Sequence, residues 1–398
     1  MMTVDVFNVV LSIFLSVLFT AFFIPQVLIV SFRKKLFDYA DERKVHTGIV
    51  PRLGGVAFVP SIIVTVAFVI GVNALLLPES MHCFFNDKQL AFGICAMLLL
   101  YFEGIMDDLV GLRYRTKFVF QIFSALLVVA SGIWLNDFYG LFGVHSVSPY
   151  FGMPFTVLII VFLINAINLI DGIDGLASGL SIVASFFFGL MFVYVQLWGC
   201  AILAFAMFGT LCPFFYYNVF GKADKCRKIF MGDTGSQCIG LILSFLAVRL
   251  AMREPLMAHN VDGAIIVAFS MLIVPAFDVV RVVIHRIRLG HNPFEPDRCH
   301  IHHKLLDLGL SHKTAMVSIL LVGASFVVLN WALLPHCNTN IILVIDVLLW
   351  TVSQMWLTHA IKVRKRRVQF FIWSVTMKGA VLSCVEDFEK LLFFLSNE

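Results

Sequence analysis

Residues 153–195 read MPFTVLIIVFLINAINLIDGIDGLASGLSIVASFFFGLMFVYV, which is two long apolar runs separated by a polar stretch at 165–179. In that stretch Asn165, Asn168, Asp171 and Asp174 recur every third residue, so on a helical turn they share one face. A carboxylate at the bilayer centre costs about 2.5–3.5 kcal/mol even on insertion scales. The two acids therefore indicate a metal ion, another cation or a water-filled cavity, although a solvated loop between helices would have a similar composition.

The rest of the chain is comparably apolar. Of its 398 residues, 60% are hydrophobic and 14% are charged, whereas soluble domains carry about 25% charged residues. Runs of about 20 apolar residues span a bilayer as helices. Eleven such runs are predicted, at roughly 5–32, 53–77, 88–106, 117–135, 153–168, 177–198, 199–220, 233–252, 262–284, 314–334 and 341–361. The predicted fold class is all-α, a polytopic membrane protein of about eleven transmembrane helices.

No repeat, low-complexity tract or Pro/Gly/Ser-rich linker divides the sequence. We expect one integral membrane domain over 1–361 and a tail over 362–398 that begins with KVRKRR and continues as a surface helix. The first apolar run is too long for a signal peptide and is expected to be a retained helix. The nine cysteines form no CxxC pair and no metal-like spacing.

The placement of Lys and Arg predicts the orientation in the membrane. Of the 29 Lys and Arg residues, 26 lie in five segments: 33–52, 107–117, 221–232, 281–313 and 362–398. The exceptions are Lys88, Arg249 and Arg253. These segments and the C-terminus are therefore expected in the cytoplasm, with the N-terminus outside. The net charge of +4 reflects this topology and gives no reason to expect nucleic-acid binding.

Polar stretches on the predicted cytoplasmic side contain candidate site residues. The segment DERKVHTGIVPRLGG, residues 41–55, combines Lys44, His46 and Arg52 with a glycine pair before the second apolar run. Basic side chains and glycines at a helix start suit a diphosphate, which backbone N–H groups and the helix dipole also attract.

Two adjacent acids, Asp107 and Asp108, end the third apolar run in the motif MDDL at 106–109. Acids oppose the dipole at a helix C-terminus, so the pair indicates a functional role: holding a metal, orienting a cation or acting as a general base. Lys117 follows at the start of the next run. It could contact a lipid phosphate, although snorkelling to the interface is the ordinary role of such a lysine.

Further along, Asp233 lies in MGDTGS at 231–236, where the eighth run begins. It could cap that helix or belong to a site together with Asn168. The segment 275–312 is rich in Arg and His, and its candidate residues are Arg281, Arg288, His300, His302 and His303. A basic cluster of this kind suits a phosphate-bearing substrate. The compact HIHH could instead bind zinc, although only Asp297 is available to complete such a site.

Five motifs together resemble the polyprenyl-phosphate N-acetylhexosamine-1-phosphate transferases of the glycosyltransferase 4 family. The resemblance is closest to the WecA-like branch and more distant to MraY. The motifs are DERKVHTGIVPRLGG, MDDL, NAINLIDGIDGLASG, MGDTGS and PFEPDRCHIHHKLLDLG, in the family's order over residues 41–309.

The resemblance implies a reaction at the cytoplasmic face of a bacterial inner membrane. Undecaprenyl phosphate would attack a UDP-N-acetylhexosamine, with UDP-GlcNAc as the expected donor, to release UMP and start a lipid-linked cell-envelope glycan. Mg²⁺ would be the cofactor, with Mn²⁺ as an alternative, and a homodimer is compatible with the family. UDP-QuiNAc or UDP-FucNAc could replace the donor.

The resemblance also implies residue roles. Asn168 and Asp233 would be the metal ligands. Asp107 and Asp108 would be the essential acidic pair, acting either as a base or in positioning, while Asp171 and Asp174 would meet the nucleotide or the outer shell of the metal. Lys117 would contact the lipid phosphate. The sugar nucleotide would meet Lys44, His46, Arg52, Arg281, Arg288, His300, His302 and His303. Either Lys44 or His46 would match the family's functional lysine.

An ion-coupled transporter or flippase is the alternative from a different functional class. Such a protein keeps its polar groups near the middle of the bilayer. Here the candidate acids crowd the predicted cytoplasmic ends of the apolar runs, which favours an enzyme.

Overall fold

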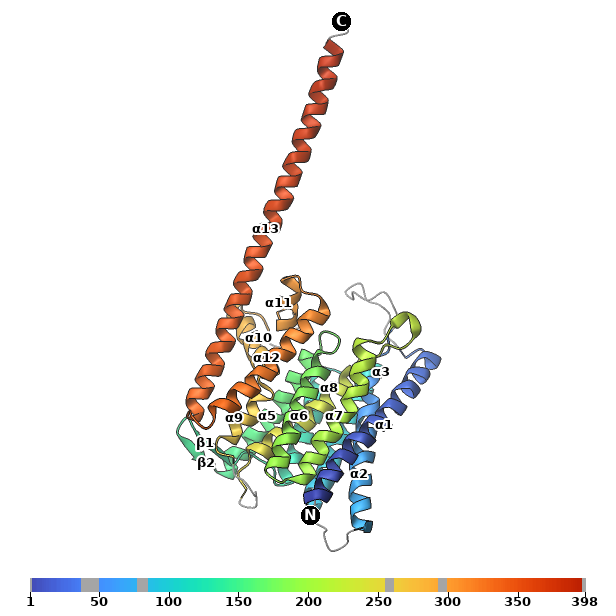
Figure 1. Cartoon of the computed structure of the whole chain (residues 1–398), viewed down its shortest axis with the longest axis vertical. Coiled ribbons are helices and arrows are strands. Elements are labelled where there is room, and N and C mark those ends of the chain that lie inside the picture. The colour runs from blue at the N-terminus through green and yellow to red at the C-terminus, as the bar shows by residue number, and fades with distance from the viewer. Residues whose placement is uncertain (1, 37–49, 77–84, 255–260, 293–298, 396–398) are drawn as a thin grey trace.

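A computed structural model describes residues 2–36, 50–76, 85–254, 261–292 and 299–395. Lys44 and His46, the candidates in the first basic segment, lie outside these ranges, as does Asp297. Figure 1 shows a bundle of helices with a small hairpin at one end and one long helix leaving the other.

The elements follow one another along the chain as helices joined by short connections. The first half contains α1 (Met2–Lys34), the 3-10 turn η1 (Gly54–Ala57), α2 (Phe58–Leu76), α3 (Asp87–Val110), α4 (Tyr114–Ala130), β1 (Asp137–Leu141), β2 (Val144–Ser146), α5 (Pro149–Ile170) and α6 (Leu176–Tyr194). The second half contains α7 (Trp198–Val219), η3 (Ala223–Lys225), α8 (Gly232–Ala251), α9 (Ala264–Ser270), α10 (Ile273–Arg288), α11 (Ile301–Asp307), α12 (His312–Leu333) and α13 (Thr339–Leu395).

Helix α8 forms the centre of the bundle and is buried along its length. It packs against α3 and α5, and η1 meets its first turn. The approach is close because glycines face each other: a Cβ on Gly55 would lie 2.0 Å from the backbone nitrogen of Gly235. A Cβ on Gly240 would likewise lie 2.8 Å from the Cα of Ile164 in α5. These contacts bring the start of α8 next to the ends of α3 and α5.

The outer helices expose apolar side chains, as expected for a surface in contact with lipid. On α1, the side chains of Phe7, Phe14 and Phe22 are 60–63% exposed. On α13, Val352, Met355 and Trp356 are 62–67% exposed. The prediction of an all-α polytopic membrane protein is therefore confirmed.

The count of eleven spans is not confirmed. Within the described ranges, nine helices are long and apolar enough to cross a membrane, and ten if one bent pair forms a single span. The run predicted at 117–135 corresponds to α4, whose 17 residues reach about 26 Å, less than the hydrocarbon core of about 30 Å.

The bent pair is α9 and α10, so the single helix expected over 262–284 is broken, with an angle of 77° between its two parts. Pro275 explains where it breaks. Proline has no N–H for the carbonyl of Met271, and its ring would clash with that carbonyl. The chain accordingly leaves helical geometry between Ser270 and Ile273.

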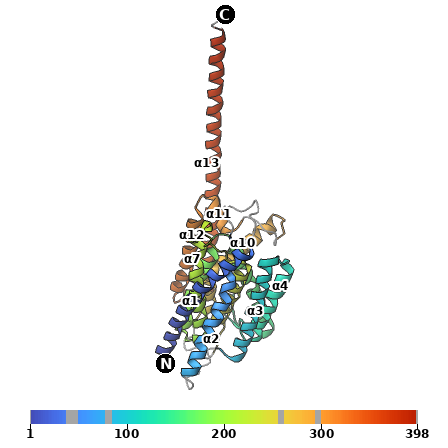
Figure 2. The same ribbon diagram turned by 90° about the vertical axis from the view of Figure 1, so that its right-hand side faces the viewer.

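Helix α13 has 57 residues, which corresponds to about 85 Å. It runs along the bundle and then projects beyond it (Figure 1 and Figure 2). The boundary expected at residues 361 and 362 falls inside this continuous helix.

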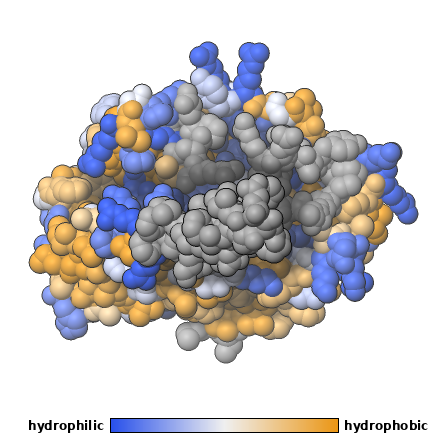
Figure 3. Space-filling view, turned by 90° about the horizontal axis from the view of Figure 1, so that it is seen from above, coloured by the Kyte–Doolittle hydropathy of each residue, from blue (hydrophilic) through white to orange (hydrophobic). Residues whose placement is uncertain are grey.

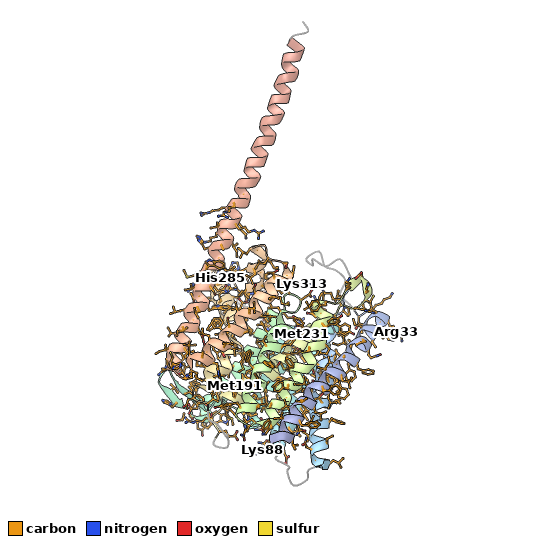
Figure 4. The ribbon with its side chains drawn as sticks, viewed as in Figure 1. Arg33, Lys88, Met191, Met231, His285 and Lys313 are labelled. Atoms are coloured by element: carbon orange, nitrogen blue, oxygen red, sulfur yellow. The ribbon has the colours of Figure 1, made fainter. Side chains whose placement is uncertain are left out.

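The two termini lie at opposite ends of the bundle (Figure 1). Arg33, His285 and Lys313 lie toward the end where α13 leaves, whereas Lys88 lies at the other end (Figure 4). We call the first of these the basic end. Figure 3 looks onto it and shows hydrophilic residues gathered there, with apolar residues around the sides. That the basic end faces the cytoplasm stays a prediction.

A two-stranded antiparallel hairpin, β1 and β2, closes the opposite end and was not predicted. Its turn uses Gly140 and Gly143 at positive φ, a conformation that glycine adopts readily. The side chain of Asn340 at the start of α13 accepts a hydrogen bond from the Phe142 N–H at 2.7 Å and donates one to the Gly140 carbonyl at 2.9 Å. The hairpin therefore anchors the N-terminal end of α13.

Candidate active site

The candidate acids meet in one cavity at the basic end. The cavity has a volume of 620 Å³ and is formed by the end of α3, the connection from α5 to α6, the start of α8 and the segment before η1. Its polar lining includes Asp107, Asp108, Asn168, Asp171, Asp174 and Asp233, together with Arg52 and His312. We call it the acid cavity. Residues more than a hundred positions apart in sequence are thus brought together.

Lys117 joins two of these acids. Its Nζ lies 2.5 Å from Oδ2 of Asp107 and also donates to Oδ2 of Asp233. The second oxygen of Asp107 accepts the Leu112 N–H at 2.7 Å. The position between Asp107 and Asp233 is therefore built for positive charge, which the Lys117 ammonium supplies.

Asp108 has a different environment, because it caps helix α8. Its carboxylate accepts the N–H of Asp233 at 2.8 Å, the N–H of Thr234 at 3.0 Å and the Thr234 hydroxyl at 2.6 Å. These N–H groups belong to the first turn of α8, where helical N–H groups have no partner within the helix. The alternative in which Asp233 caps α8 is wrong, since Asp233 lies inside the helix and Asp108 satisfies these groups.

Gly232 makes this contact between helices possible. Its φ is +73°, and a Cβ there would lie 2.6 Å from Oδ2 of Asp108 and 2.0 Å from the carbonyl oxygen of Arg52. Any other residue would separate α3 from α8. Gly232 of MGDTGS is thus required by the close packing, and the next residue, Asp233, faces the cavity.

Asn168 contacts Asp233 directly. Its Nδ2 donates to Oδ1 of Asp233 at 3.1 Å and to the Ser236 hydroxyl at 2.8 Å. Asn168 lies near the end of α5 and Asp233 at the start of α8. The two residues expected to share a metal are therefore adjacent.

Asp171 and Asp174 follow at the end of α5. The Asp171 side chain is open to the cavity, but surrounding protein atoms displace most of the bulk water. This desolvation raises the pKa of Asp171 to about 7, and the nearby charges of Asp233 and Asp174 add to the effect. Asp174 forms an ion pair with Lys228, with Oδ2 and Nζ 2.5 Å apart.

Lys228 and Asn218 were missed by the sequence reasoning. The Asn218 amide accepts the Gly175 N–H at 2.6 Å and donates to the Ile229 carbonyl at 2.9 Å. It therefore fixes the loop after Asp174 against the segment that leads to α8. The available signal was the charge of Lys228 only three residues before MGDTGS.

A layer of amides lies beneath the acid cavity. Asn165 donates to Gln121 at 2.7 Å, and Gln121 donates to Gln237 at 3.0 Å. Asn165 follows the same every-third-residue pattern as Asn168, Asp171 and Asp174, but it contacts this amide layer and does not line the cavity. Glu103 is fully buried here, near Gln237 and Lys117.

The predicted Arg/His cluster is only partly joined to the acids. Arg281 donates to Oδ1 of Asp278 at 2.7 Å and to the Cys299 carbonyl at 2.5 Å. Arg281 and Arg288 line a second cavity, and none of the described residues lines both. The structure therefore does not bring these two arginines to the carboxylates.

Asp278, which was also missed, organises the histidine segment. His300 Nδ1 lies 2.8 Å from Oδ2 of Asp278, and the Ile301 N–H donates to Oδ1 at 3.1 Å. The Asp278 carboxylate thus caps α11 from α10, in the way that Asp108 caps α8 from α3. An acid near the middle of a helix gives no sequence signal for a capping role elsewhere.

His302 joins α11 to the loop after α5. A Cβ on Gly172 would lie 2.2 Å from Nε2 of His302, so only glycine leaves room for the ring. The ring is 1% exposed, and its centre lies 4.2 Å from that of His303. Burial lowers the pKa of His302 to about 3, which keeps the ring neutral at physiological pH.

The donor set of the acid cavity suits a hard cation. Among the described residues, no three His, Cys, Asp or Glu side chains lie close enough to hold a metal ion by themselves. Mg²⁺ commonly binds through one or two protein oxygens, with waters and substrate phosphates completing its shell. Asp233 supplies a carboxylate for that mode, and Asn168, which turns its Nδ2 toward Asp233, would hold the ion through its Oδ1.

Comparison with known proteins places these residues in a family. The sequence matches the model of glycosyl transferase family 4 over residues 90–251, a range that includes Asp107 through Asp233. It is 32% identical over 321 residues to a probable undecaprenyl-phosphate N-acetylglucosaminyl 1-phosphate transferase of Bacillus subtilis, covering 80% of this chain and 83% of the relative.

Two further relatives have similar names. An undecaprenyl-phosphate alpha-N-acetylglucosaminyl 1-phosphate transferase of Salmonella typhi is 30% identical over 79% of this chain and 80% of its own length. A decaprenyl-phosphate N-acetylglucosaminephosphotransferase of Mycolicibacterium smegmatis is 30% identical over 77% of each chain. With this similarity along most of its length, and with the motif acids gathered in one cavity, the chain belongs to glycosyl transferase family 4.

Proposed function

We propose that this protein transfers N-acetylglucosamine-1-phosphate from UDP-GlcNAc to undecaprenyl phosphate and releases UMP. The names of the relatives supply the sugar phosphate and the lipid. The observation that carries the proposal is the meeting of Asp107, Asn168 and Asp233 around one cavity at the basic end of the bundle. A bacterial inner membrane, with the basic end in the cytoplasm, is the proposed setting.

The chemistry requires alignment and charge compensation more than proton transfer. A phosphate monoester is already ionised near neutral pH, since its second pKa is about 6 in phosphorylated side chains. Undecaprenyl phosphate therefore needs little help from a base. Lys117, at the junction of α4 with the cavity, is the cation placed to hold its phosphate, while Asp107 and Asp233 orient that lysine.

The acidic pair divides its work in this proposal. Asp108 is occupied by the first turn of α8, so it positions Asp233 and touches no substrate. Asp107 keeps one oxygen on Lys117 and lines the cavity, so it is the member that would face the reacting phosphates. The proposal therefore assigns both acids to positioning, and neither to base catalysis.

A divalent cation is part of the proposal. Mg²⁺, or Mn²⁺ in its place, would offset the charge of the diphosphate and of the leaving UMP. Asp233 and Asn168 would hold it, and Asp171 and Asp174 would border the nucleotide side of the same cavity. Lys228 would keep Asp174 in place through its ion pair.

The depth of the acids argues against a transporter. Asp107 lies in the last turn of α3, Asn168 in the last turn of α5 and Asp233 in the first turn of α8. A coupling-ion site would sit near the middle of the bilayer. The acids instead border the aqueous end, where a water-soluble nucleotide sugar can enter.

The test is UMP release by the purified full-length chain. Undecaprenyl phosphate and Mg²⁺ are supplied with a panel of donors: UDP-GlcNAc, UDP-QuiNAc and UDP-FucNAc. We expect UMP and a lipid-linked sugar with UDP-GlcNAc, and loss of both in Asp233→Asn. Asp224→Asn is the matched control, because Asp224 is exposed on η3 at the same end. If no donor in the panel led to release of UMP, the proposed function would be overturned. If another donor were preferred over UDP-GlcNAc, only the choice of sugar would be overturned.

A further inference from the structure

A second cavity, of 810 Å³, lies between α10, α11 and α13. The part of the cavity farthest from the basic end is apolar and contains Phe277, Val347 and Trp350, while Ile284 and Met355 add apolar surface closer to that end. We call it the α10–α13 cavity. None of the described residues that line it also lines the acid cavity, so it is a separate feature of the molecule.

The rim of this cavity at the basic end is cationic. It contains Arg281, His285, Arg288, Lys304, His359 and Lys362, and no Asp or Glu lines the cavity within the described ranges. Figure 4 shows His285 at this level, next to α13. Apolar walls below a cluster of bases suit an amphiphile with an anionic head.

Protein carboxylates neutralise two of these bases only in part or not at all. Lys304 donates to neutral acceptors, Gln354 Oε1 at 3.1 Å and Thr358 Oγ1 at 3.2 Å. Arg281 has one nitrogen on Asp278, but its buried Nε has no hydrogen-bond partner among the described residues. The Arg281 side chain is 18% exposed and borders the cavity together with Lys304, so an anion there would meet both positive charges. Burial and the charge of Arg281 accordingly lower the pKa of Lys304 to about 8.

The length of the cavity matches one leaflet of a bilayer. Along α13 it extends from Val347 to Lys362, which is about 22 Å at 1.5 Å per residue. Half of a bilayer, including its headgroup region, measures about 20–22 Å. In a bilayer whose headgroups are level with Lys362, the apolar wall would lie at the depth of the acyl chains and the bases at the depth of the phosphates.

We propose that the α10–α13 cavity binds an anionic phospholipid of the surrounding membrane, with its phosphate at Arg281, Arg288, Lys304 and Lys362. Two observations favour this lipid over the polyprenyl substrate. The cavity is as long as a single leaflet, and it shares no described lining residue with the acid cavity.

The bound lipid would also support the position of α11. Arg281 contacts both Asp278 and the Cys299 carbonyl, and Asp278 caps α11. Helix α11 in turn places His302 against Gly172 beside the acid cavity. An anion at Arg281 would therefore stabilise the link between the two cavities.

The experiment is native mass spectrometry of the purified full-length protein titrated with phosphatidylglycerol, phosphatidylcholine or undecaprenyl phosphate. We expect phosphatidylglycerol to bind about tenfold or more tightly than phosphatidylcholine. Lys304→Gln combined with Lys362→Gln should remove most of this preference. Lys362→Gln alone should weaken binding severalfold, and since Lys362 is exposed, this single variant does not endanger folding.

The matched control is Arg366→Gln combined with Arg367→Gln, which removes two positive charges, as the cavity double variant does, but from exposed positions of α13 outside the cavity. This control should keep the preference. Equal binding of both phospholipids, or equal loss in control and cavity variants, would overturn the proposal. Displacement of phosphatidylglycerol by undecaprenyl phosphate would also overturn it, because the cavity would then belong to the substrate. A changed number of protein copies in the cavity variants would overturn it as well, because the cavity would then bind a second copy of the chain. Lipid binding measured in this way does not depend on transferase activity, so the test is independent of the proposed function.

Discussion

At the residue scale, the neighbouring acids Asp107 and Asp108 differ in what their carboxylates contact. Asp108 accepts three hydrogen bonds from the first turn of α8, whereas Asp107 lines the acid cavity and pairs with Lys117. Adjacent residues on a helix point about 100° apart, so one can face a neighbouring helix while the other faces a cavity. Their substitutions should therefore affect different properties.

Asp108→Ala should lower thermal stability, because it leaves two N–H groups of α8 without a partner. Loss of a helix cap costs about 0.5–2 kcal/mol. Asp108→Asn keeps an acceptor oxygen and should restore most of the loss. The measurement is the melting temperature of the detergent-purified protein, and equal melting of Asp108→Ala and the unmodified chain would contradict the capping role.

Asp107→Asn should instead impair turnover and leave melting nearly unchanged. The amide oxygen can still accept the Leu112 N–H, but the charge that orients Lys117 is lost. We expect the rate of UMP release to fall by about a hundredfold, the size typical of one electrostatic contact to reacting groups. A large fall in melting temperature with normal turnover would show that Asp107 is structural.

His302 gives a pH-dependent prediction. Its folded pKa of about 3 lies below its ordinary value of 6.5, because burial disfavours the charged ring. Below pH 6.5 the unfolded chain takes up a proton that the folded chain does not, so stability falls as pH decreases by about 1.4 kcal/mol per pH unit from this group. His302→Gln should lose less stability between pH 6.5 and pH 5 than the unmodified chain. Parallel pH profiles would contradict the buried, neutral ring.

At the element scale, the site depends on how closely η1 and α3 approach the start of α8. Gly55 and Gly232 permit that approach, since a Cβ on either residue would lie 2.0 Å from a backbone atom of the segment packed against it. Backbone atoms cannot move aside as a flexible side chain can. The glycines of the motifs PRLGG and MGDTGS are therefore geometric requirements for the arrangement of the acids.

Gly55→Ala should destabilise the bundle by about 1–3 kcal/mol or more, the cost typical of overpacking, and should reduce UMP release because α8 is displaced. Gly71→Ala in α2 is the matched control. Nothing lies within 4 Å of a Cβ there, so we expect unchanged or slightly raised stability. Similar melting temperatures for the two variants would contradict the close packing of η1 on α8.

At the scale of the whole molecule, composition and the positions of the acids predicted most of what the structure shows. Apolar runs predicted the membrane class, and acids at run ends on one predicted side indicated a shared site. Asp107, Asn168 and Asp233 do share one cavity. The three run ends near these acids were predicted at 106, 168 and 233, within about four residues of the helix ends at Val110, Ile170 and Gly232. All three lie at the same end of the bundle.

Other features depended on packing that the sequence did not reveal. Asp278 and Lys228 act through partners far along the chain, His300 and Asp174, so nothing local distinguished them. Arg281 and Arg288 were expected with the acids, but α10 turns away from α9 by 77° and presents them to the α10–α13 cavity. Pro275 marked that break in the sequence, but it did not indicate the direction of the turn.

The central claim is that one cavity holds the nucleotide diphosphate together with its metal. The most direct measurement is an experimental density map of the full-length protein with UDP-GlcNAc and Mg²⁺. We predict the diphosphate in the acid cavity, with the metal in contact with Asn168 and Asp233 and the uridine near Asp171 and Asp174. A diphosphate located in the α10–α13 cavity, or a metal that contacts neither Asn168 nor Asp233, would contradict the account.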